Sequence, residues 1–492
     1  MEEKRNESYD HVLKYTWIFG GVQGLVILIG LVRNKFMALL LGTGGVGLNA
    51  LLTSAQNFAS QCTNMGISFG AVPRLSEYYE QQRQDMLDYY IQVIRLWSLI
   101  ASLLGFVFCI VISPFINDLS FTWGNHTLHY AMLALAVAMI AITGGETAIL
   151  KATRRLGALA RIQVYTAIAS VFLSVPLYYY FEHSGVVPAI VLIAGMSMLT
   201  TILYSYSCCP LRLNFNRSQL KNGASMIKLG LAFVLAAAIG SAAEMLIRAF
   251  LNVEGGLDDV GLYNVGYMLT ITYAGMVFSS METDYFPRLS AVSRDVVQTN
   301  EMVNKQMEVS LLLLSPMLVA LLTALPVLVP LLFSKEFLPV VGMAQVAVLA
   351  MYFKVLSMPM AYITFARSYS LSYLLLETSY FIILVAAIVV GYRTWGIWGT
   401  GLAIVIAHVA ELTIVSSYSY WKYHYRSTWP IVRYTMIQML IGFAAYVVTC
   451  LTKGWLYWIT ETALILVSTA YSIHILHQKT HLWEALKRKF RI

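Results

Sequence analysis

Two stretches of the chain begin and end with the same short words: VGLNALLTSAQNFASQCTNMGISFGAVPRLS at residues 46–76 and VGLYNVGYMLTITYAGMVFSSMETDYFPRLS at residues 260–290. The offset that takes VGL from position 46 to position 260 also takes PRLS from position 73 to position 287, and we call it the repeat displacement. Two short segments shared at the same displacement predict an internal duplication, and below we call VGL and PRLS the repeated words. Further matches are Phe36 with Phe250 and Ala152 with Ala366 at the repeat displacement, and Pro114 with Pro330 and Gly185 with Gly396 near it.

The composition predicts an integral membrane protein. Of the 492 residues, 58% are hydrophobic and 12% are charged, and the mean hydropathy is +0.67. Soluble domains carry about 25% charged residues. A helix crosses the roughly 30 Å hydrocarbon core with about 20 mostly apolar residues. Apolar runs of about that length recur from residue 91 to residue 475, and weaker segments lie near 15–40, 45–72 and 260–286, so we predict about fourteen transmembrane helices.

An even number of spans separates equivalent helices, so the two repeats share one orientation in the membrane. We therefore predict an all-α polytopic protein with two parallel six-helix repeats around a central cavity and two added C-terminal helices. Parallel repeats of this kind are typical of alternating-access transporters. A channel with duplicated halves is the alternative, although the sequence shows neither a filter-like loop nor a dense ring of acidic residues. The predicted parts are an N-terminal bundle at 1–210, a C-terminal bundle at 211–424, two further helices at 425–476 and a basic tail at 477–492.

The distribution of cationic residues predicts the topology. With the N-terminus in the cytoplasm, 25 of the 33 Lys and Arg residues lie in cytoplasmic segments, as the positive-inside rule requires. Both termini are then cytoplasmic, and each PRLS marks the cytoplasmic exit of helix two or helix eight, where Pro ends the span. The net charge of +8 reflects topology, so we expect no nucleic-acid partner. The tail reads either as an amphipathic helix on an anionic leaflet or as a solvated segment.

Several cations lie inside apolar segments, where an ionised side chain costs about 2.5–3.5 kcal/mol on insertion scales and normally faces a wet cavity or a partner. Arg33 and Lys35 lie at the end of helix one, Arg248 lies in helix seven near the repeat-equivalent position of Arg33, and Lys354 lies in helix ten. These four residues predict a cationic cavity that binds a phosphate or pyrophosphate. The alternative is that they snorkel towards the membrane interface, which fits Lys35 best.

Acidic residues and one histidine are candidates for a coupling ion or a gate. Glu244 lies four residues before Arg248, which favours a local ion pair, and His408 lies three residues before Glu411. Glu282 and Asp284 lie close to the second PRLS and fit a gate or interface better. Any of these groups could carry H⁺ or Na⁺, and structural pairing is an equally good explanation. The candidates are Glu146, Glu244, Glu282, Asp284, His408 and Glu411.

Enzyme and metal signatures are missing from the sequence. It has no P-loop, no HExxH and no nucleophile elbow. The five cysteines have neither metal-ligand spacing nor a disulfide framework, so we interpret them as packing residues. The sequence therefore predicts a transporter with no metal and no cofactor other than a coupling ion.

Three stretches resemble a known family. NKFMALLLGTGGVGLNALLTSAQNFASQCTNMGISFG (34–70), VGLYNVGYMLTITYAGMVFSSMETDYFPRLSAV (260–292) and ILKATRRLGALARI (149–162) are similar to polysaccharide flippases of the O-antigen (Wzx) type in the multidrug/oligosaccharidyl-lipid/polysaccharide (MOP) exporter superfamily. The resemblance covers about the first 420 residues. It implies two six-helix bundles in a bacterial inner membrane that carry an undecaprenyl-pyrophosphate-linked oligosaccharide, such as an O-antigen or capsule unit, to the periplasmic leaflet.

The resemblance leaves other functions open. Membrane lipids and the polymerase of the same pathway are the partners that it implies. Lipid II flippases of the superfamily use arginines on helices one, two and eight. Here Arg33 fits the first roughly, but helix two has no internal Arg and helix eight has only Arg288 at its cytoplasmic end. This departure favours a polysaccharide repeat unit over lipid II. A cation-coupled multidrug exporter would need an acidic cavity, and this one is predicted to be cationic. A membrane glycosyltransferase would need a large outward loop or a catalytic acidic motif, and the predicted outward loops are short.

Overall fold

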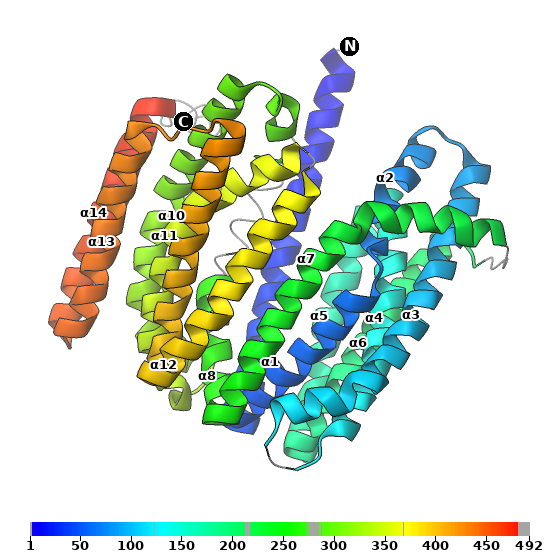
Figure 1. Ribbon diagram of the computed structural model, residues 1–492, viewed down its shortest axis with the longest axis horizontal. Helices are drawn as coiled ribbons and strands as arrows, with labels where there is room; N and C mark the ends of the chain where they lie inside the picture. Colours follow the sequence, from blue (N-terminus) through cyan, green and yellow to red (C-terminus); the bar gives the residue numbers. More distant parts are fainter. Residues whose placement is uncertain are drawn as a thin grey trace. The chain divides into compact units, whose positions relative to one another are not determined.

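The computed structural model describes an all-helical chain (Figure 1), with no strand among the residues that it places. It describes residues 2–122, 124–211, 217–272, 275, 285–286, 288–367 and 369–480, and it leaves undescribed the side chains of 2–20, 68–69, 217–218, 221–222, 225–226, 228–233, 370 and 480. The helices are α1 (Glu2–Thr63), α2 (Ile67–Glu80), α3 (Gln84–Ser120), α4 (Thr127–Ala152), α5 (Leu156–Phe181), η1 (Glu182–Gly185), α6 (Val186–Cys208), α7 (Arg217–Gly255), α8 (Leu257–Tyr267), η2 (Met268–Thr272), α10 (Val296–Leu332), η3 (Lys335–Val340), α11 (Val341–Ala366), α12 (Ser370–Tyr423), α13 (Trp429–Leu451) and α14 (Trp455–Thr480).

Within the described residues, ten helical runs are long and apolar enough to cross a membrane. Many large apolar side chains on them are exposed, among them Val111 (72%) and Phe172 (74%), as expected of a surface that faces lipid. Three of the runs contain a break and are long enough for two crossings: Gly21–Thr63 at Gly42, Leu156–Cys208 at η1 and Leu371–Tyr423 at Gly396. The prediction of a multi-pass α-helical membrane protein is confirmed. The count of fourteen stays a prediction, because residues 276–284 lie outside the described part.

The long helix α12 is a hairpin that reverses at Gly396. The φ angle of Gly396 is +59°, a left-handed conformation that glycine adopts without strain. The hydroxyl of Tyr418 donates a 2.6 Å hydrogen bond to Ser372 Oγ, although the two residues are 46 positions apart in one continuous helical run. The two halves of α12 are therefore antiparallel neighbours.

The backbone repeats at the displacement predicted from the sequence. Helices α4 and α11 begin at Thr127 and Val341, and α5 and α12 begin at Leu156 and Ser370, so the repeat displacement relates both pairs. Left-handed φ angles recur at the same displacement, at Gly42 and Gly256 and again at Glu182 and Gly396. These coincidences confirm the duplication.

The structure changes one of the predicted repeat pairs, that of Gly185 with Gly396. Gly185 approaches the carbonyl of Leu177, and Gly399 approaches the carbonyl of Gly391 in the same way, with both residues moved by the repeat displacement. The structural equivalent of Gly185 is therefore Gly399 and not Gly396, which is instead the equivalent of Glu182. Sequence alone could not separate two glycines so close together.

The glycines of the two VGL words lie against each other. A Cβ atom added to Gly47 would come within 2.9 Å of the backbone nitrogen of Gly261, and it would overlap the carbonyl oxygen of Leu257. A Cβ added to Gly261 would overlap the carbonyl oxygen of Thr43. Small residues allow two membrane helices to approach this closely. The repeated word thus marks the crossing of α1 with the start of α8, where the hydroxyl of Thr43 also donates a hydrogen bond to Asp258.

The chain forms two compact units. Unit one comprises Met1–Gly261 with Leu332–Ser334, and unit two comprises Leu262–Leu331 with Lys335–Ile492. Helix α7 belongs to unit one, where it contacts α1, α2 and α3. Its Asn252 donates a 2.6 Å hydrogen bond to the carbonyl of Ser120 at the end of α3. The bundle boundaries predicted from the sequence stay predictions.

The added helices α13 and α14 lie side by side in unit two (Figure 1). A buried polar contact joins them: Gln438 donates to Ser472 Oγ at 2.9 Å and accepts from Ser468 Oγ at 2.7 Å.

The prediction that Pro73 of the first PRLS ends a helix is wrong. Helix α1 ends at Thr63, before a left-handed turn at Gly66, and Pro73 lies inside α2. The assignment of PRLS to the cytoplasmic side stays a prediction. In the second copy, Pro287 lies outside the described residues.

The glycine crossing generates a first test. Gly47→Ala and Gly261→Ala each force a methyl group into backbone atoms that cannot rotate away. We expect each variant to lose at least the roughly 1–3 kcal/mol that overpacking usually costs, measured as the free energy of unfolding in detergent. Gly30→Ala on α1 is the matched control, because a Cβ at Gly30 meets nothing within 4 Å. Equal stability of all three variants would contradict the crossing.

Candidate functional site

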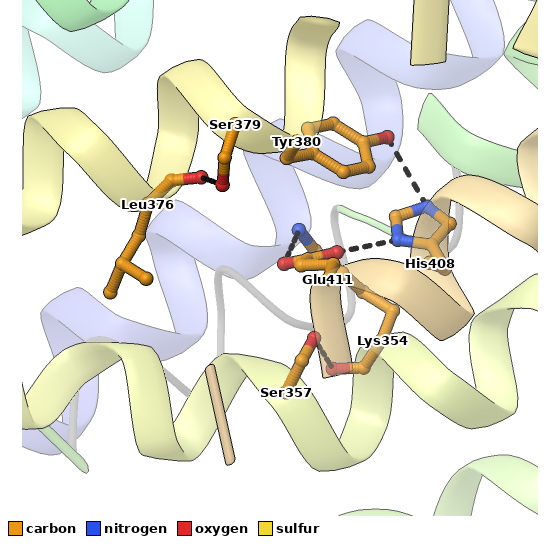
Figure 2. Close-up of polar contacts among 7 residues, drawn as sticks. All are labelled: Lys354, Ser357, Leu376, Ser379, Tyr380, His408 and Glu411. Atoms are coloured by element: carbon orange, nitrogen blue, oxygen red, sulfur yellow. Dashed lines mark hydrogen bonds and ion pairs between the residues drawn. The ribbon is translucent and has the colours of Figure 1, made fainter. Parts of the chain in front are cut away.

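Unit two contains a chain of polar side chains in the middle of its transmembrane helices. Lys354 Nζ lies 3.3 Å from Glu411 Oε1, and Glu411 Oε2 lies 2.7 Å from His408 Nδ1. His408 Nε2 in turn lies 3.4 Å from the hydroxyl of Tyr380. We call Lys354, Tyr380, His408 and Glu411 the Lys354 cluster; Figure 2 shows its members pointing toward one another.

Three helical segments position this cluster. Lys354 lies near the middle of α11, Tyr380 lies in the first half of α12, and His408 and Glu411 lie one turn apart in its second half. The reversal at Gly396 brings Tyr380 and His408 together, with ring centroids 5.1 Å apart and planes 28° from parallel. The Lys354 cluster therefore forms only because α12 reverses direction at Gly396.

The cluster is a buried charge network. His408 is 1% exposed and Glu411 is 7% exposed, whereas 30% of the Lys354 side chain is exposed. The ammonium group of Lys354 lies 5.5 Å from the centre of the Tyr380 ring, and Glu377 also interacts electrostatically with Lys354. Charges taken out of water persist only when paired and hydrogen-bonded, as Glu411 is on both of its oxygens. A proton or another cation arriving at His408 or Glu411 would change the partner of Lys354.

The equivalent positions of unit one carry no charge. At the repeat displacement, Ile140 replaces Lys354, Ala194 replaces His408 and Ser197 replaces Glu411. Ile140 and Ser197 line a cavity of about 280 Å³ in unit one, which Lys151 also lines. The two repeats therefore carry different side chains at the positions of the Lys354 cluster.

Unit one has a different buried ion pair. Arg95 on α3 makes two contacts with Glu146 on α4, at 2.9 and 3.3 Å, and Ser205 Oγ donates to Glu146 at 2.5 Å. Arg95 also donates to the carbonyls of Cys209 and Pro210 at 2.8 and 2.9 Å. Both charged side chains are only 3% exposed. This geometry gives Glu146 a structural partner, and its role in ion coupling stays a prediction.

The other predicted cations all lie in unit one. The ion pair predicted between Arg248 and Glu244 is present, with Nη1 3.1 Å from Oε2. Arg33 is half-buried and contacts Asn34 at 3.5 Å, and Lys35 donates to the backbone carbonyl of Phe333. Arg33 and Arg248 belong to unit one and Lys354 to unit two, and the anion cavity that would combine them stays a prediction. Glu282 and Asp284 lie outside the described residues.

Sequence reasoning found three members of the Lys354 cluster but assigned them to different roles. It missed Tyr380, because no short spacing connects this residue to His408. It also treated Arg95 and Glu146 separately, although they form the most buried ion pair of the described residues. No group of three or more His, Cys, Asp or Glu residues with metal-site geometry occurs in that part of the chain.

The comparisons with known proteins agree with this fold. A family described as "Polysaccharide biosynthesis protein" matches residues 36–342, more than half of the chain. A search of curated protein sequences finds no significant match. The three solved structures described below are 14–16% identical to this chain in sequence, so they show the fold alone.

Three solved structures illustrate the structural likeness. The lipid II flippase MurJ in an inward closed conformation aligns with a TM-score of 0.67 and 14% identity, covering 94% of this chain and 98% of that one. An inward-facing multidrug resistance MATE family transporter of the MOP superfamily gives 0.65 and 16%, covering 81% and 94%. An outward-facing transporter of the same description gives 0.55 and 14%, covering 82% and 93%. The fold is that of MOP superfamily transporters.

The buried pair of unit one generates a double-mutant test. Arg95→Met or Glu146→Gln alone leaves one charge buried without its partner, which typically costs about 3–5 kcal/mol. We expect the double variant to lose clearly less than the sum of the two single losses in the free energy of unfolding. The exposed pair Glu301 and Lys305 is the control, with an expected coupling of about 0.3–0.5 kcal/mol. Additive losses at Arg95 and Glu146 would show that the pair does not act as a unit.

Proposed function

Because the chain belongs to the family of polysaccharide biosynthesis proteins and has the fold of MOP superfamily transporters, we propose that it is a lipid-linked oligosaccharide flippase. Its substrate is an undecaprenyl-pyrophosphate-linked oligosaccharide, such as an O-antigen or capsule repeat unit, which moves from the cytoplasmic to the periplasmic leaflet by alternating access. The family match carries this proposal, since it is the observation that points to polysaccharide synthesis rather than to drug export.

A lipid with a charged sugar head needs a transporter to cross the membrane. The charged and hydroxylated head of such a lipid cannot cross hydrocarbon unaided, because its polar groups would lose their hydrogen bonds to water. The polyprenyl tail needs no carrier and stays in the lipid. No bond is made or broken, so the protein needs a polar path and a source of energy and no catalytic residue. That MurJ, named as a lipid II flippase, shares this fold makes a lipid-linked substrate physically reasonable.

The pyrophosphate requires cations, and we assign this role to four of the cations within the apolar helices. In the proposal, Arg33 and Arg248 bind it, because a guanidinium group can donate two hydrogen bonds to one phosphate. Lys35 and Lys354 add positive charge. Arg248 is paired with Glu244, which is 40% exposed, so a doubly charged ligand could displace this carboxylate.

The Lys354 cluster supplies the coupling in this proposal. When H⁺ or Na⁺ binds at Glu411 or His408, the carboxylate loses its hold on Lys354, whose side chain keeps 30% of its surface. The lysine is then available to an anion, and loss of the ion restores the pair. Each time the coupling ion binds, Lys354 becomes available to the substrate, and each time the ion leaves, Lys354 pairs with Glu411 again.

In the proposal, the protein lies in a bacterial inner membrane, where undecaprenyl-linked sugars are exported. Both termini are in the cytoplasm, as the distribution of Lys and Arg indicates. The polymerase of the same pathway is the protein partner that would consume the exported unit.

Transport in inverted vesicles tests the substrate assignment. We expect vesicles containing the protein to move a pyrophosphate-linked oligosaccharide into the lumenal leaflet, and Arg33→Ala and Arg248→Ala to lower the rate at least about tenfold, the effect of losing a hydrogen bond to a charged group. Arg161→Ala, an exposed cation of α5, is the matched control. Lipid II and a cationic drug are assayed in parallel. Movement of either in place of the oligosaccharide would overturn the proposal.

An imposed ion gradient tests the coupling. In native vesicles, we expect a proton or sodium gradient to accelerate transport. His408→Gln and Glu411→Gln should abolish this acceleration while leaving slow exchange without a gradient. Glu301→Gln, which removes an exposed carboxylate of α10, should respond like the native chain. Gradient-dependent transport by both cluster variants would exclude the Lys354 cluster as the coupling site.

A further inference from the structure

Helices α10 to α13 of unit two surround an open groove of about 790 Å³, distinct from the Lys354 cluster. Its walls are mainly apolar and include Met307, Leu356 and Leu412. One end carries a cation and hydroxyl groups, from Arg426, Ser427 and Tyr420. The groove therefore has an apolar length and a polar, positively charged end.

The length of the groove corresponds to one leaflet of a bilayer. On α12 its lining extends from Leu412 to Tyr420, which is about 12 Å at 1.5 Å per residue. Half of the hydrocarbon core is about 15 Å thick. An acyl chain lying along the groove would thus keep its head at the membrane surface, beside the segment that joins α12 to α13.

Arg426 is an exposed side chain with no carboxylate partner among the described residues. Its charged neighbours in the sequence are cations as well. Lys422 lies 5.6 Å from the ring centre of Tyr369, and Arg433 lies 5.6 Å from that of Tyr434. This end of unit two is therefore positively charged and suited to an anion.

The backbone around Arg426 is held in place by α10. Asn304 donates to the carbonyl of Arg426 at 3.0 Å and accepts from the hydroxyl of Tyr425 at 2.7 Å. Asn300 donates to the carbonyl of His424 at 3.2 Å. Burial raises the pKa of Tyr425, so its hydroxyl keeps the proton that it donates. Arg426 thus projects from a fixed segment, which lowers the entropy cost of binding a ligand there.

We propose that the groove is a binding site for one anionic phospholipid of the surrounding membrane, with an acyl chain along α12 and α13 and its phosphate on Arg426. Basic pockets between transmembrane helices bind acidic lipid heads in this way. The hydroxyl of Thr435, which lines the groove, has no hydrogen-bond partner among the described residues and offers a second polar contact.

Charge argues against two other occupants. A zwitterionic lipid such as phosphatidylcholine would fill the apolar length and also present a phosphate, but it would add its choline cation to the cationic end of the groove. The chain's own C-terminal segment carries Lys487, Arg488, Lys489 and Arg491 and would be repelled by the cationic end. The inference rests on the membrane setting and not on the transported substrate, so it can fail or hold independently of the proposed function.

Native mass spectrometry of the purified full-length protein tests this site. The protein is titrated with phosphatidylglycerol and with phosphatidylcholine of identical acyl chains. We expect a single tightly bound phosphatidylglycerol and weaker phosphatidylcholine binding. Arg426→Ala should weaken phosphatidylglycerol binding at least about tenfold and remove the preference between the two lipids. Ser417→Trp, which fills the groove, should weaken both lipids.

Arg433→Ala is the matched control, because it removes a cation at the same end of α13 that does not line the groove. Arg426 is exposed, so its loss should leave the melting temperature unchanged and keep the test valid even if Ser417→Trp folds poorly. Equal affinity of the native protein for both lipids would overturn the proposal. So would equal losses in Arg426→Ala and Arg433→Ala, or preferential displacement of phosphatidylglycerol by an undecaprenyl phosphate at the same concentration.

Discussion

The fold depends on a backbone contact between the equivalent glycines of the two VGL words, Gly47 and Gly261. No side chain fits at either position, so the helices on both sides approach through backbone atoms. The reversals that follow in each repeat, at Glu182 and Gly396, are again related by the repeat displacement. In this chain the equivalent glycines of the two VGL words are in contact, inside unit one.

The two repeats share a backbone but differ in chemistry. In unit one, Arg95, paired with Glu146, binds the backbone carbonyls that follow α6. In unit two, Asn300 and Asn304 bind the backbone carbonyls that follow α12. The charged Lys354 cluster occurs in unit two alone among the described residues. In the proposed function, the Arg95–Glu146 pair keeps one arrangement during transport and the Lys354 cluster alternates between two.

The sequence could predict whatever depends on composition, register or one helical turn. It predicted the all-helical membrane fold, the duplication and the ion pair of Glu244 with Arg248. It could not predict contacts that need a reversal of the chain. Tyr380 meets His408 only because Gly396 turns an otherwise continuous apolar helix, and Arg95 meets Glu146 across 51 residues. The prediction that Pro73 of the first PRLS ends a helix was wrong, because Pro73 lies inside α2.

The most direct test of this account is disulfide trapping at the glycine crossing. Thr43→Cys and Asp258→Cys are combined in a chain without its native cysteines, because these two side chains are in contact beside Gly47 and Gly261. After mild oxidation in native membranes, mass spectrometry of the digested protein should find the linked peptides. The control combines Thr43→Cys with Glu244→Cys. Because Glu244 lies further back along α7 than the crossing, this pair should stay unlinked. Equal linkage of both pairs, or of neither, would contradict the crossing on which the duplicated fold depends.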